Sequence, residues 1–289
     1  MTKSGFVALV GRPNTGKSTL LNALIGEKIA IVSYRPQTTR NRINGILTDG
    51  DYQIVFTDTP GIHNPKTRLG DEMVSRAKTT VTDSDMAVLV VEPRLPGDIE
   101  KTIIRSFQKN NIHAILAVNK IDTINKANLL PVISAYSELY GFSDIVPISS
   151  LKRDGVDILL NIIKKNMVEG PFYYPDYMKS DVDERTAICE VVREKFLKLL
   201  NEEVPHGLAL ETIVYEDTEN LLTLGINVYC EREGHKRIII GKNGDLIKKV
   251  GTYAREELEK KYDKKIFLEL WVKIDADWRN KPNKIKNFI

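Results

Sequence analysis

Short apolar runs, each ending at a polar or glycine-rich segment, recur through the first 165 residues. The runs at 6–10, 54–56 and 115–118 are too short for helices, and they lack polar alternation, as strands buried in a sheet do. Residues 156–165 instead repeat apolar side chains at helical spacing, which predicts an amphipathic helix. Strands alternating with helices predict an α/β domain with a mixed, mostly parallel sheet.

This pattern ends at Gly170 and Pro171, because glycine and proline terminate helices, and Pro175 stiffens the segment that follows. The aromatic side chains of this segment either pack against a domain, which we favour, or stack on RNA bases. We therefore expect a first domain over 1–169, a linker over 170–182 and a second domain over 183–289 that ends in a C-terminal tail.

The second domain has a different order of elements. A helix is expected over 184–201, followed by strands near 208–215 and 222–230. A helix over 245–262 and a strand over 266–274 follow. With a further helix before residue 245, to which we give no bounds, the expected order is α-β-β-α-α-β. This order predicts a small α+β domain.

Length and composition favour a soluble two-domain protein. The chain of 289 residues is longer than a single α/β domain needs. No apolar run approaches the ~18 residues of a membrane span. We expect no signal peptide, because the N-terminus leads straight into the first strand. Cys189 and Cys230 lack disulfide or metal spacing, which favours buried thiols in a reducing cytosol. The four histidines are scattered, and we assign none of them to a metal.

The first chemical motif lies between the strand at 6–10 and a helix expected over 18–24. Gly11, Gly16, Lys17 and Ser18 occupy the fixed positions of a G-x-x-x-x-G-K-[ST] phosphate loop. Its backbone N–H groups face phosphate oxygens, Lys17 brings a charge to the β- and γ-phosphates, and Ser18 offers a hydroxyl to Mg²⁺. The loop predicts a nucleoside triphosphate site.

A second motif, an N-K-x-D string, selects the base. The Asp122 carboxylate can accept from the N1–H and N2–H₂ donors of guanine, a pair that adenine lacks. Asn119 can hydrogen-bond the base edge and brace the phosphate loop, and the Lys120 stem can lie against the purine. The segment Ile148-Ser149-Ser150, after a further apolar run, can complete the pocket, with Ser149 as the predicted contact. GTP and GDP are therefore the expected nucleotides.

Further residues point to the metal and the γ-phosphate. Asp58 follows a buried strand and can hold the Mg²⁺ shell, and the Gly61 N–H can meet the γ-phosphate. A threonine of the Gln-Thr-Thr-Arg segment at 37–40 closes over Mg²⁺ when the γ-phosphate is present; we predict Thr39, with Thr38 open as the alternative. The predicted metal ligands are Ser18, Thr39 and Asp58, and the predicted catalytic groups are Lys17, Thr39 and Gly61.

Intrinsic hydrolysis is expected to be slow, because Ile62 stands where Ras-like proteins carry a water-orienting glutamine. Asn14 either helps hold a potassium ion, as an asparagine does in some relatives, or serves turn geometry. The predicted nucleotide-binding residues are Gly11, Asn14, Thr15, Gly16, Lys17, Ser18, Thr19, Asp58, Thr59, Pro60, Gly61, Ile62, Asn119, Lys120, Asp122 and Ser149. The order of these motifs, each after an expected strand, is similar to that of translation-factor-type GTPase domains.

The second domain carries a Gly241-Lys242-Asn243-Gly244 turn between apolar stretches. A G-x-x-G turn lets the backbone approach a sugar–phosphate chain, as in KH domains, which clamp single strands. Residues 171–230 hold 5 basic and 12 acidic side chains, whereas 231–289 hold 16 and 10, so positive charge gathers around this turn. The predicted RNA-binding residues are Arg232, Lys236, Arg237, Gly241, Lys242, Asn243, Gly244 and Lys248.

From Phe6 to about Trp278 the chain resembles a family of bacterial GTPases of small ribosomal subunit assembly, which join a GTPase domain to a type II KH domain. The resemblance includes Asp-Thr-Pro-Gly-Ile at 58–62, the Tyr-Tyr-Pro linker, Arg-Glu-Lys at 193–195 and Leu-Glu-Leu-Trp-Val-Lys at 268–273. Ser150 departs from the alanine usual in the family.

This resemblance implies binding to the 3′ end of 16S rRNA and a role in 30S subunit biogenesis. It also implies a cytoplasmic pool with some peripheral membrane association. Separately, we expect a monomer. Two other classes stay open. A tRNA-modification or signalling GTPase should lack the G-x-x-G turn, and a pure RNA-binding module should have a damaged nucleotide site.

Overall fold

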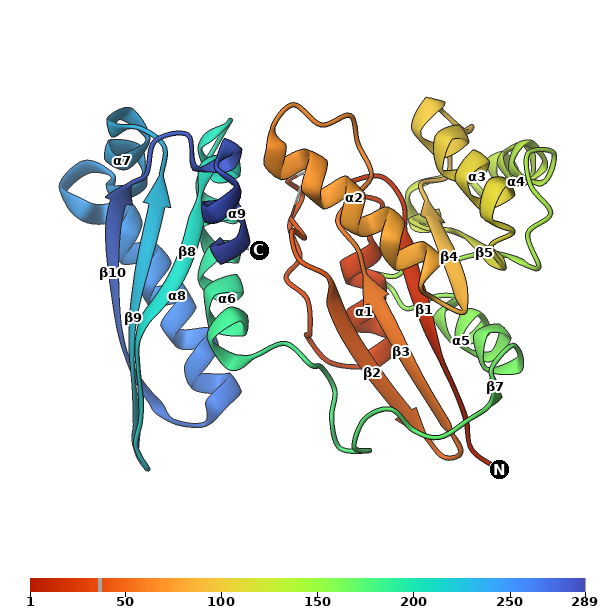
Figure 1. Ribbon diagram of the computed structural model, residues 1–289, viewed down its shortest axis with the longest axis horizontal. Helices are drawn as coiled ribbons and strands as arrows, with labels where there is room; N and C mark the ends of the chain where they lie inside the picture. The colour runs from red at the N-terminus through yellow and green to blue at the C-terminus, as the bar shows by residue number, and fades with distance from the viewer. Residues whose placement is uncertain (36–37, 289) are drawn as a thin grey trace. The chain divides into compact units, whose positions relative to one another are not determined.

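The computed structural model describes residues 1–35 and 38–288, which form two compact units. The first unit contains residues 1–66 and 70–181, and the second contains residues 67–69 and 182–289. Each unit has its own sheet (Figure 1). No described helix is both long and apolar enough to cross a membrane.

The first unit is built on a sheet with the strand order β2-β3-β1-β4-β5-β6, and β7 pairs antiparallel with the first two residues of β1. β1 is parallel to β3 and β4, while β2 runs antiparallel to β3, so the mixed, mostly parallel sheet is confirmed. The strands are β1 Lys3–Val10, β2 Ile43–Asp49, β3 Tyr52–Asp58, β4 Met86–Val91, β5 Ala114–Val118, β6 Ile145–Pro147 and β7 Val168–Glu169.

Helices cover both faces of this sheet. On one face, side chains of α2, α3 and α4 join Ala8, Val10 and Leu116 in a single buried cluster. α1 packs against β1, β2, β3 and α5 on the other face. Every residue of β4 is buried, as expected for a strand enclosed by helices on both sides. The helices are α1 Lys17–Ile25, α2 Arg68–Thr82, α3 Asp98–Asn110, α4 Leu129–Ser137 and α5 Val156–Lys165, with 3₁₀ turns at Ile121–Thr123 and Lys126–Asn128.

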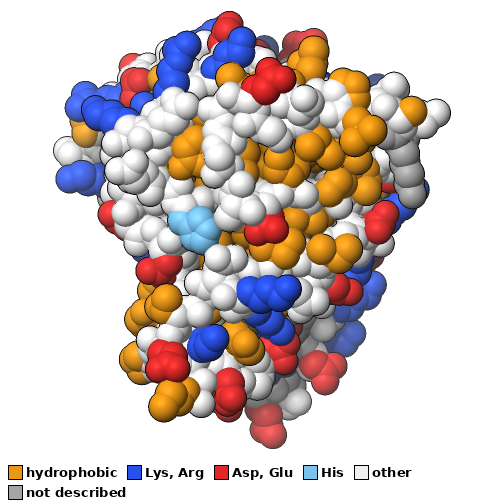
Figure 2. Space-filling view, turned by 90° about the vertical axis from the view of Figure 1, so that its right-hand side faces the viewer, with side chains coloured by type: hydrophobic (Ala, Val, Ile, Leu, Met, Phe, Trp, Pro, Cys, Tyr) orange, Lys and Arg blue, Asp and Glu red, His pale blue; other side chains and the backbone are white. Residues whose placement is uncertain are grey.

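The side of the first unit that carries α3, α4 and α5 is shown in Figure 2. Apolar side chains gather on part of this face, and acidic and basic side chains are scattered around them. Leu130 of α4 and Ile158 of α5 are among the exposed apolar residues. Exposed apolar side chains are common on folded proteins, and we assign this face no role.

The linker is held on the first unit by a buried glutamine. Gln53 accepts hydrogen bonds from the backbone N–H groups of Tyr173 and Tyr174 and donates from Nε2 to the Tyr174 carbonyl. The ring of Tyr173 packs on Phe6, with ring centroids 4.8 Å apart. Packing against a domain, the alternative that we favoured for these aromatics, is thereby confirmed for Tyr173.

The second unit has a three-stranded sheet with the order β10-β9-β8, in which β9 is parallel to β10 and antiparallel to β8. The predicted α-β-β-α-α-β order is confirmed. The elements are α6 Glu184–Leu199, β8 Ala209–Asp217, β9 Leu221–Cys230, α7 Glu233–Ile240, α8 Asp245–Tyr262, β10 Lys265–Ile274 and α9 Pro282–Phe288, with 3₁₀ turns at Val204–Gly207, Lys242–Gly244 and Trp278–Asn280.

The helices α6, α7 and α8 pack on one face of this sheet. Alternate residues of β9, from Leu222 to Cys230, enter a buried cluster with side chains of these helices. From the sequence we expected the residues of α9 to form a C-terminal tail, but the structure shows a short helix there. Phe288 of α9 packs on Tyr229 and on the buried Trp278, with centroids 5.1 and 5.3 Å apart.

Candidate functional site

The phosphate loop connects the end of β1 to the start of α1 and depends on two glycines. Gly11 has φ +154°, and a Cβ there would lie 2.3 Å from the Val90 carbonyl oxygen. Gly16 has φ +95°, and its Cβ would lie 2.3 Å from the Asn119 amide nitrogen. Any larger residue would displace β4 or the Asn119 side chain, so the sequence preserves the close approach that the loop requires.

Lys17 projects into the loop from the first residue of α1. Its Nζ donates to the carbonyls of Gly11 and Arg12 at 3.3 and 2.9 Å. Burial lowers the pKa of Lys17 to about 8, and the nearby Asp58 carboxylate partly opposes this shift. The ammonium is therefore held ready at the centre of a loop shaped for an anion.

Three predicted metal ligands meet beside the lysine. The Ser18 and Thr39 hydroxyls both donate to Asp58 Oδ2, at 2.6 and 3.0 Å, and the two hydroxyl oxygens are 2.9 Å apart. Thr38 instead donates to the Arg35 carbonyl at 2.7 Å, so the structure favours Thr39 over Thr38. Gln37 of the same segment lies outside the described residues.

Asp58 is fully buried, and its Oδ1 atom has no hydrogen-bond partner among the described residues. Burial raises the pKa of this carboxyl group, while Lys17 and the two hydroxyl donors counteract the shift. A buried carboxylate with one open oxygen beside two hydroxyls is a set of hard oxygen ligands. The residues present therefore fit a hard divalent cation such as Mg²⁺.

The segment after Asp58 lies under the phosphate loop. Thr59 donates to the Leu9 carbonyl at 2.8 Å, and the Ile62 N–H donates to the Gly11 carbonyl at 3.0 Å. A Cβ on Gly61 would lie 2.5 Å from the Pro13 nitrogen, so only glycine fits there. Ile62 is buried in the apolar cluster, where its side chain cannot orient a water molecule.

The predicted base-binding residues converge at the ends of β5 and β6. Asn119 donates to the Thr15 carbonyl at 2.8 Å, which ties the N-K-x-D string to the phosphate loop. The Ser149 hydroxyl donates to Asp122 Oδ1 at 2.6 Å and is the first cause of the lowered pKa of that carboxyl group. Asp122 is therefore ionised near neutral pH and remains an acceptor for ligand donors.

Ser150 was predicted only as part of the pocket segment, and Glu92 was missed from the sequence. Ser150 donates to Asn119 Oδ1 from both its N–H and its hydroxyl, so the departure from alanine adds a brace rather than removing one. Glu92, after β4, pairs with Lys120 Nζ at 2.6 Å. Glu92 lies outside the predicted motifs, and only the meeting of the adjacent ends of β4 and β5 reveals it.

The other predicted nucleotide-binding residues lie in or beside the phosphate loop. Asn14 has φ +66°, as its turn role predicts, and its amide also donates to the Tyr34 carbonyl at 2.9 Å. Thr15 donates to the Arg12 carbonyl at 3.1 Å, and the half-buried Thr19 lies in the first turn of α1. Pro60 is buried beside Thr59.

The G-x-x-G turn of the second unit joins α7 to α8. Gly241, Asn243 and Gly244 have φ of +76°, +53° and +80°, so the turn depends on residues that tolerate a left-handed backbone. Lys242, Asn243, Arg237 and Lys248 are exposed around it, and Lys236 is half-buried. Arg232 is exposed but donates from Nε to His235 at 2.8 Å, which holds it at the start of α7.

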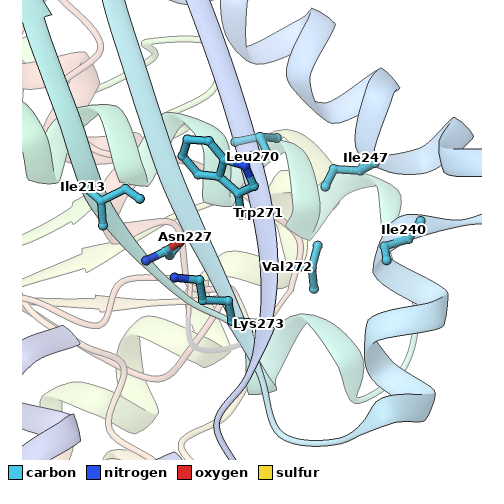
Figure 3. A pocket seen from close by; sticks show the side chains of 8 residues that line it. All are labelled: Ile213, Asn227, Ile240, Ile247, Leu270, Trp271, Val272 and Lys273. Carbon is cyan, nitrogen blue, oxygen red and sulfur yellow. The ribbon is translucent and has the colours of Figure 1, made fainter.

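A hollow of about 560 Å³ borders the edge of β10 that pairs with no described strand (Figure 3). On the helix side it is lined by Ile240 of α7, Ile247 of α8 and the residues Leu270 and Val272. The unpaired edge of a strand offers backbone donors and acceptors to a bound chain. Apolar walls, a free strand edge and the adjacent G-x-x-G turn together form a groove suited to a single-stranded nucleic acid.

The lowered pKa of Lys17 predicts how diphosphate binding depends on pH. Below pH 8 the Lys17 amino group is already protonated. Above pH 8 it is mostly neutral, so it must take up a proton when the phosphate binds. Between pH 7 and pH 9 the Kd for GDP should therefore rise about tenfold, as measured by titration calorimetry. Lys17→Ala should bind more weakly without this rise, and an equal rise in both proteins would contradict the assignment.

Two family descriptions match the chain. Residues 6–120 match the 50S ribosome-binding GTPase family, and residues 203–279 match the KH domain family. The chain is 46% identical to GTPase Era of Clostridium kluyveri over 288 residues, which cover 99% of this chain and 98% of that protein. GTPase Era of Ruminiclostridium cellulolyticum is 46% identical over 286 residues, covering 98% and 96%.

Two solved structures agree over both units. Era in complex with MgGDPNP and nucleotides 1506–1542 of 16S ribosomal RNA superimposes with a TM-score of 0.96 at 38% identity, covering 100% of this chain and 99% of the other. A single-residue variant of Aquifex aeolicus Era bound to GDP·AlF4⁻ gives a TM-score of 0.95 at 37% identity, covering 99% of both chains. The chain is therefore a GTPase that belongs to the Era family.

Proposed function

We propose that this GTPase binds the 3′ region of 16S rRNA through its KH domain and acts in assembly of the 30S subunit. The observation that supports this most directly is the full-length likeness to an Era protein complexed with nucleotides 1506–1542 of that RNA. The exposed G-x-x-G turn beside an apolar groove is the feature of this chain suited to such a ligand. Cytoplasmic action follows from a ribosomal partner.

The nucleotide site divides into three tasks under this proposal. Lys17 and the backbone of residues 11–18 hold the phosphates, and Asp122 reads the guanine. Ser18, Thr39 and Asp58 would hold Mg²⁺, which supplies charge neutralisation at the phosphates when it is bound. Thr39 already bonds to Asp58, so the segment that carries it is placed to respond to the γ-phosphate.

Hydrolysis under this proposal depends on positioning and electrostatics. Ile62 offers no hydrogen bond to an attacking water, whereas Lys17 and the Gly61 N–H can stabilise the charge that develops on the γ-phosphate. Slow intrinsic turnover follows. The missing stabilisation must come from an additional cation or partner.

We further propose residues 183–289 as the RNA-binding domain, 170–182 as the linker and a monomer as the working form. From the family resemblance alone we also propose that part of the protein associates with the membrane surface. Sedimentation of the purified protein and flotation with anionic lipid vesicles test the last two points. A stable dimer, or absence from the floated fraction at low salt, would count against them.

Asp122→Asn should move nucleotide specificity from GTP toward XTP. The amide that replaces the carboxylate can donate to the O2 carbonyl of xanthine but cannot accept from both guanine donors, a loss of about 1–3 kcal/mol or more. Competition between GTP and XTP measures the change. Unchanged GTP affinity together with no XTP binding would refute the role given to Asp122.

The combined substitutions Lys242→Asp and Asn243→Asp should abolish most binding to single-stranded RNA. Both glycines of the turn remain, so the turn can still form, but two carboxylates now repel phosphate, most strongly at low salt. Affinity is measured by fluorescence anisotropy with the 1506–1542 segment of 16S rRNA.

GTP binding serves as the internal control for this variant, because residues 11–18 and 119–122 lie in the other unit. A fragment that begins near Asp181 and carries the same substitutions separates folding from binding, since the second unit has its own core. Normal RNA binding by the full-length double variant would place the RNA site elsewhere.

GTP turnover should be faster in KCl than in NaCl at equal ionic strength. The Asn14 side chain and the Tyr34 carbonyl lie together beside the phosphate loop, where an additional cation could neutralise transition-state charge. Asn14→Asp keeps an oxygen ligand and should retain the potassium effect, whereas Asn14→Ala should lose it. Equal rates in the two salts would limit Asn14 to its role in the turn.

A further inference from the structure

The hollow at β10 continues beyond the helix side of the sheet. Its remaining lining residues are Ile213, Asn227, Trp271 and Lys273, which come from all three strands (Figure 3). Asn227 and Trp271 lie opposite each other in β9 and β10. Their neighbours along each strand face the helices, so these two side chains point to the other face. This part of the hollow therefore lies on the sheet face opposite α7 and α8.

Asn227 carries an unsatisfied acceptor in this part of the hollow. The residue is 3% exposed, and its Oδ1 is buried without a hydrogen-bond partner among the described residues. A buried acceptor left unpaired is costly, and such groups are rare in folded proteins. Its presence in the lining of an open hollow indicates a ligand that donates a hydrogen bond.

The orientation of the Asn227 amide follows from its neighbours. Tyr229 donates its hydroxyl proton to Glu211 at 2.7 Å, so the tyrosine oxygen can only accept from Asn227. Asn227 Nδ2 is the donor to that oxygen, at 3.2 Å. The chain Asn227–Tyr229–Glu211 thus fixes the NH₂ group toward Tyr229 and leaves the carbonyl oxygen for a donor from outside.

The walls beside this acceptor are flat and apolar. A Cβ on Gly225 would lie 2.6 Å from the six-membered ring of Trp271, so this glycine allows the indole to settle on the sheet. Trp271 is nevertheless 38% exposed, and Ile213, at a bulge in β8, is 47% exposed. A bulge redirects a side chain, and here it leaves Ile213 at the hollow.

The charges suit an uncharged ring better than a phosphate. Lys273 lies on one side of the hollow, but the Glu211 carboxylate is held on Tyr229 close to Asn227. α9 approaches this face, because Phe288 packs on Tyr229, which lies two residues after Asn227 in β9. An aromatic platform, an apolar wall and a single orphan acceptor match a planar base with an exocyclic amino group.

We propose that one nucleobase of the bound RNA crosses the edge of β10, stacks on Trp271 and donates an amino hydrogen bond to Asn227 Oδ1. This site rests on the proposed RNA-binding function and extends it to the opposite face of the sheet. The ligand is adenine, cytosine or guanine within a single strand, because uracil has no amino group. The G-x-x-G turn holds the backbone, and the second site holds a base.

Binding of the 1506–1542 segment of 16S rRNA to the full-length protein tests this assignment. Asn227→Leu removes the hydrogen-bond acceptor, and Trp271→Ala removes the stacking surface. Each substitution should weaken RNA binding about tenfold. Neither variant removes a phosphate contact, so the slope of log Kd against log salt should not change. Phe267→Ala is the matched control, because Phe267 is 53% exposed on the same strand and face but does not line the hollow.

Tryptophan emission gives a second readout, since the other tryptophan, Trp278, is fully buried. RNA should quench the wild-type emission, and Trp271→Phe should remove the quenching with little loss of affinity. Abasic substitution along the RNA should find one position whose effect disappears in Asn227→Leu. An unchanged thermal unfolding midpoint of the fragment that begins near Asp181 confirms that each variant keeps the second unit folded.

The outcomes separate this site from the function on which it rests. If Asn227→Leu and Trp271→Ala bind RNA as Phe267→Ala does, while the Lys242→Asp, Asn243→Asp variant fails to bind, the base site is refuted and RNA binding stands. If that double variant binds normally, the proposed RNA function itself fails. Quenching by AMP or CMP alone at the affinity of the RNA would assign the hollow to free nucleotides and overturn the proposal.

Discussion

The nucleotide site depends on the burial of one carboxylate. Asp58 ends β3 in an interior position where an isolated negative charge would be costly, so the fold must surround it with donors. Those donors come from two other segments, Ser18 of α1 and Thr39 after it, and Lys17 adds the opposite charge. One buried group thereby fixes the phosphate loop against the segment expected to sense the γ-phosphate.

At the guanine-binding end of the site, the uncharged side-chain amide of Asn119 has a similar organising role. Asn119 donates to the Thr15 carbonyl and accepts twice from Ser150, so a single amide links the phosphate loop, β5 and the segment after β6. A planar amide with all these partners has little freedom to rotate. The segments that bind the guanine base and the phosphates are therefore coupled through the hydrogen bonds of one side chain, Asn119.

Residue patterns predicted the elements that carry these groups, because each motif follows a buried strand whose carboxyl end the sheet places at one edge. They could not decide between Thr38 and Thr39, since that choice depends on the path of an irregular backbone. Gln53, which holds the linker about 120 residues away, left no local signal. The α9 helix was missed because its Phe288 packs on aromatic side chains that lie elsewhere in the sequence.

The central claim is that one chain combines a guanine nucleotide site with an independent groove for single-stranded rRNA. Ultraviolet crosslinking of the protein to the small-subunit RNA that copurifies with it, followed by mass spectrometry, tests this claim most directly. The account predicts crosslinks from peptides that contain residues 241–248 and 270–273 to the 3′ end of 16S rRNA, with GTP bound at the same time. Crosslinks confined to the first unit, or to other RNAs only, would contradict it.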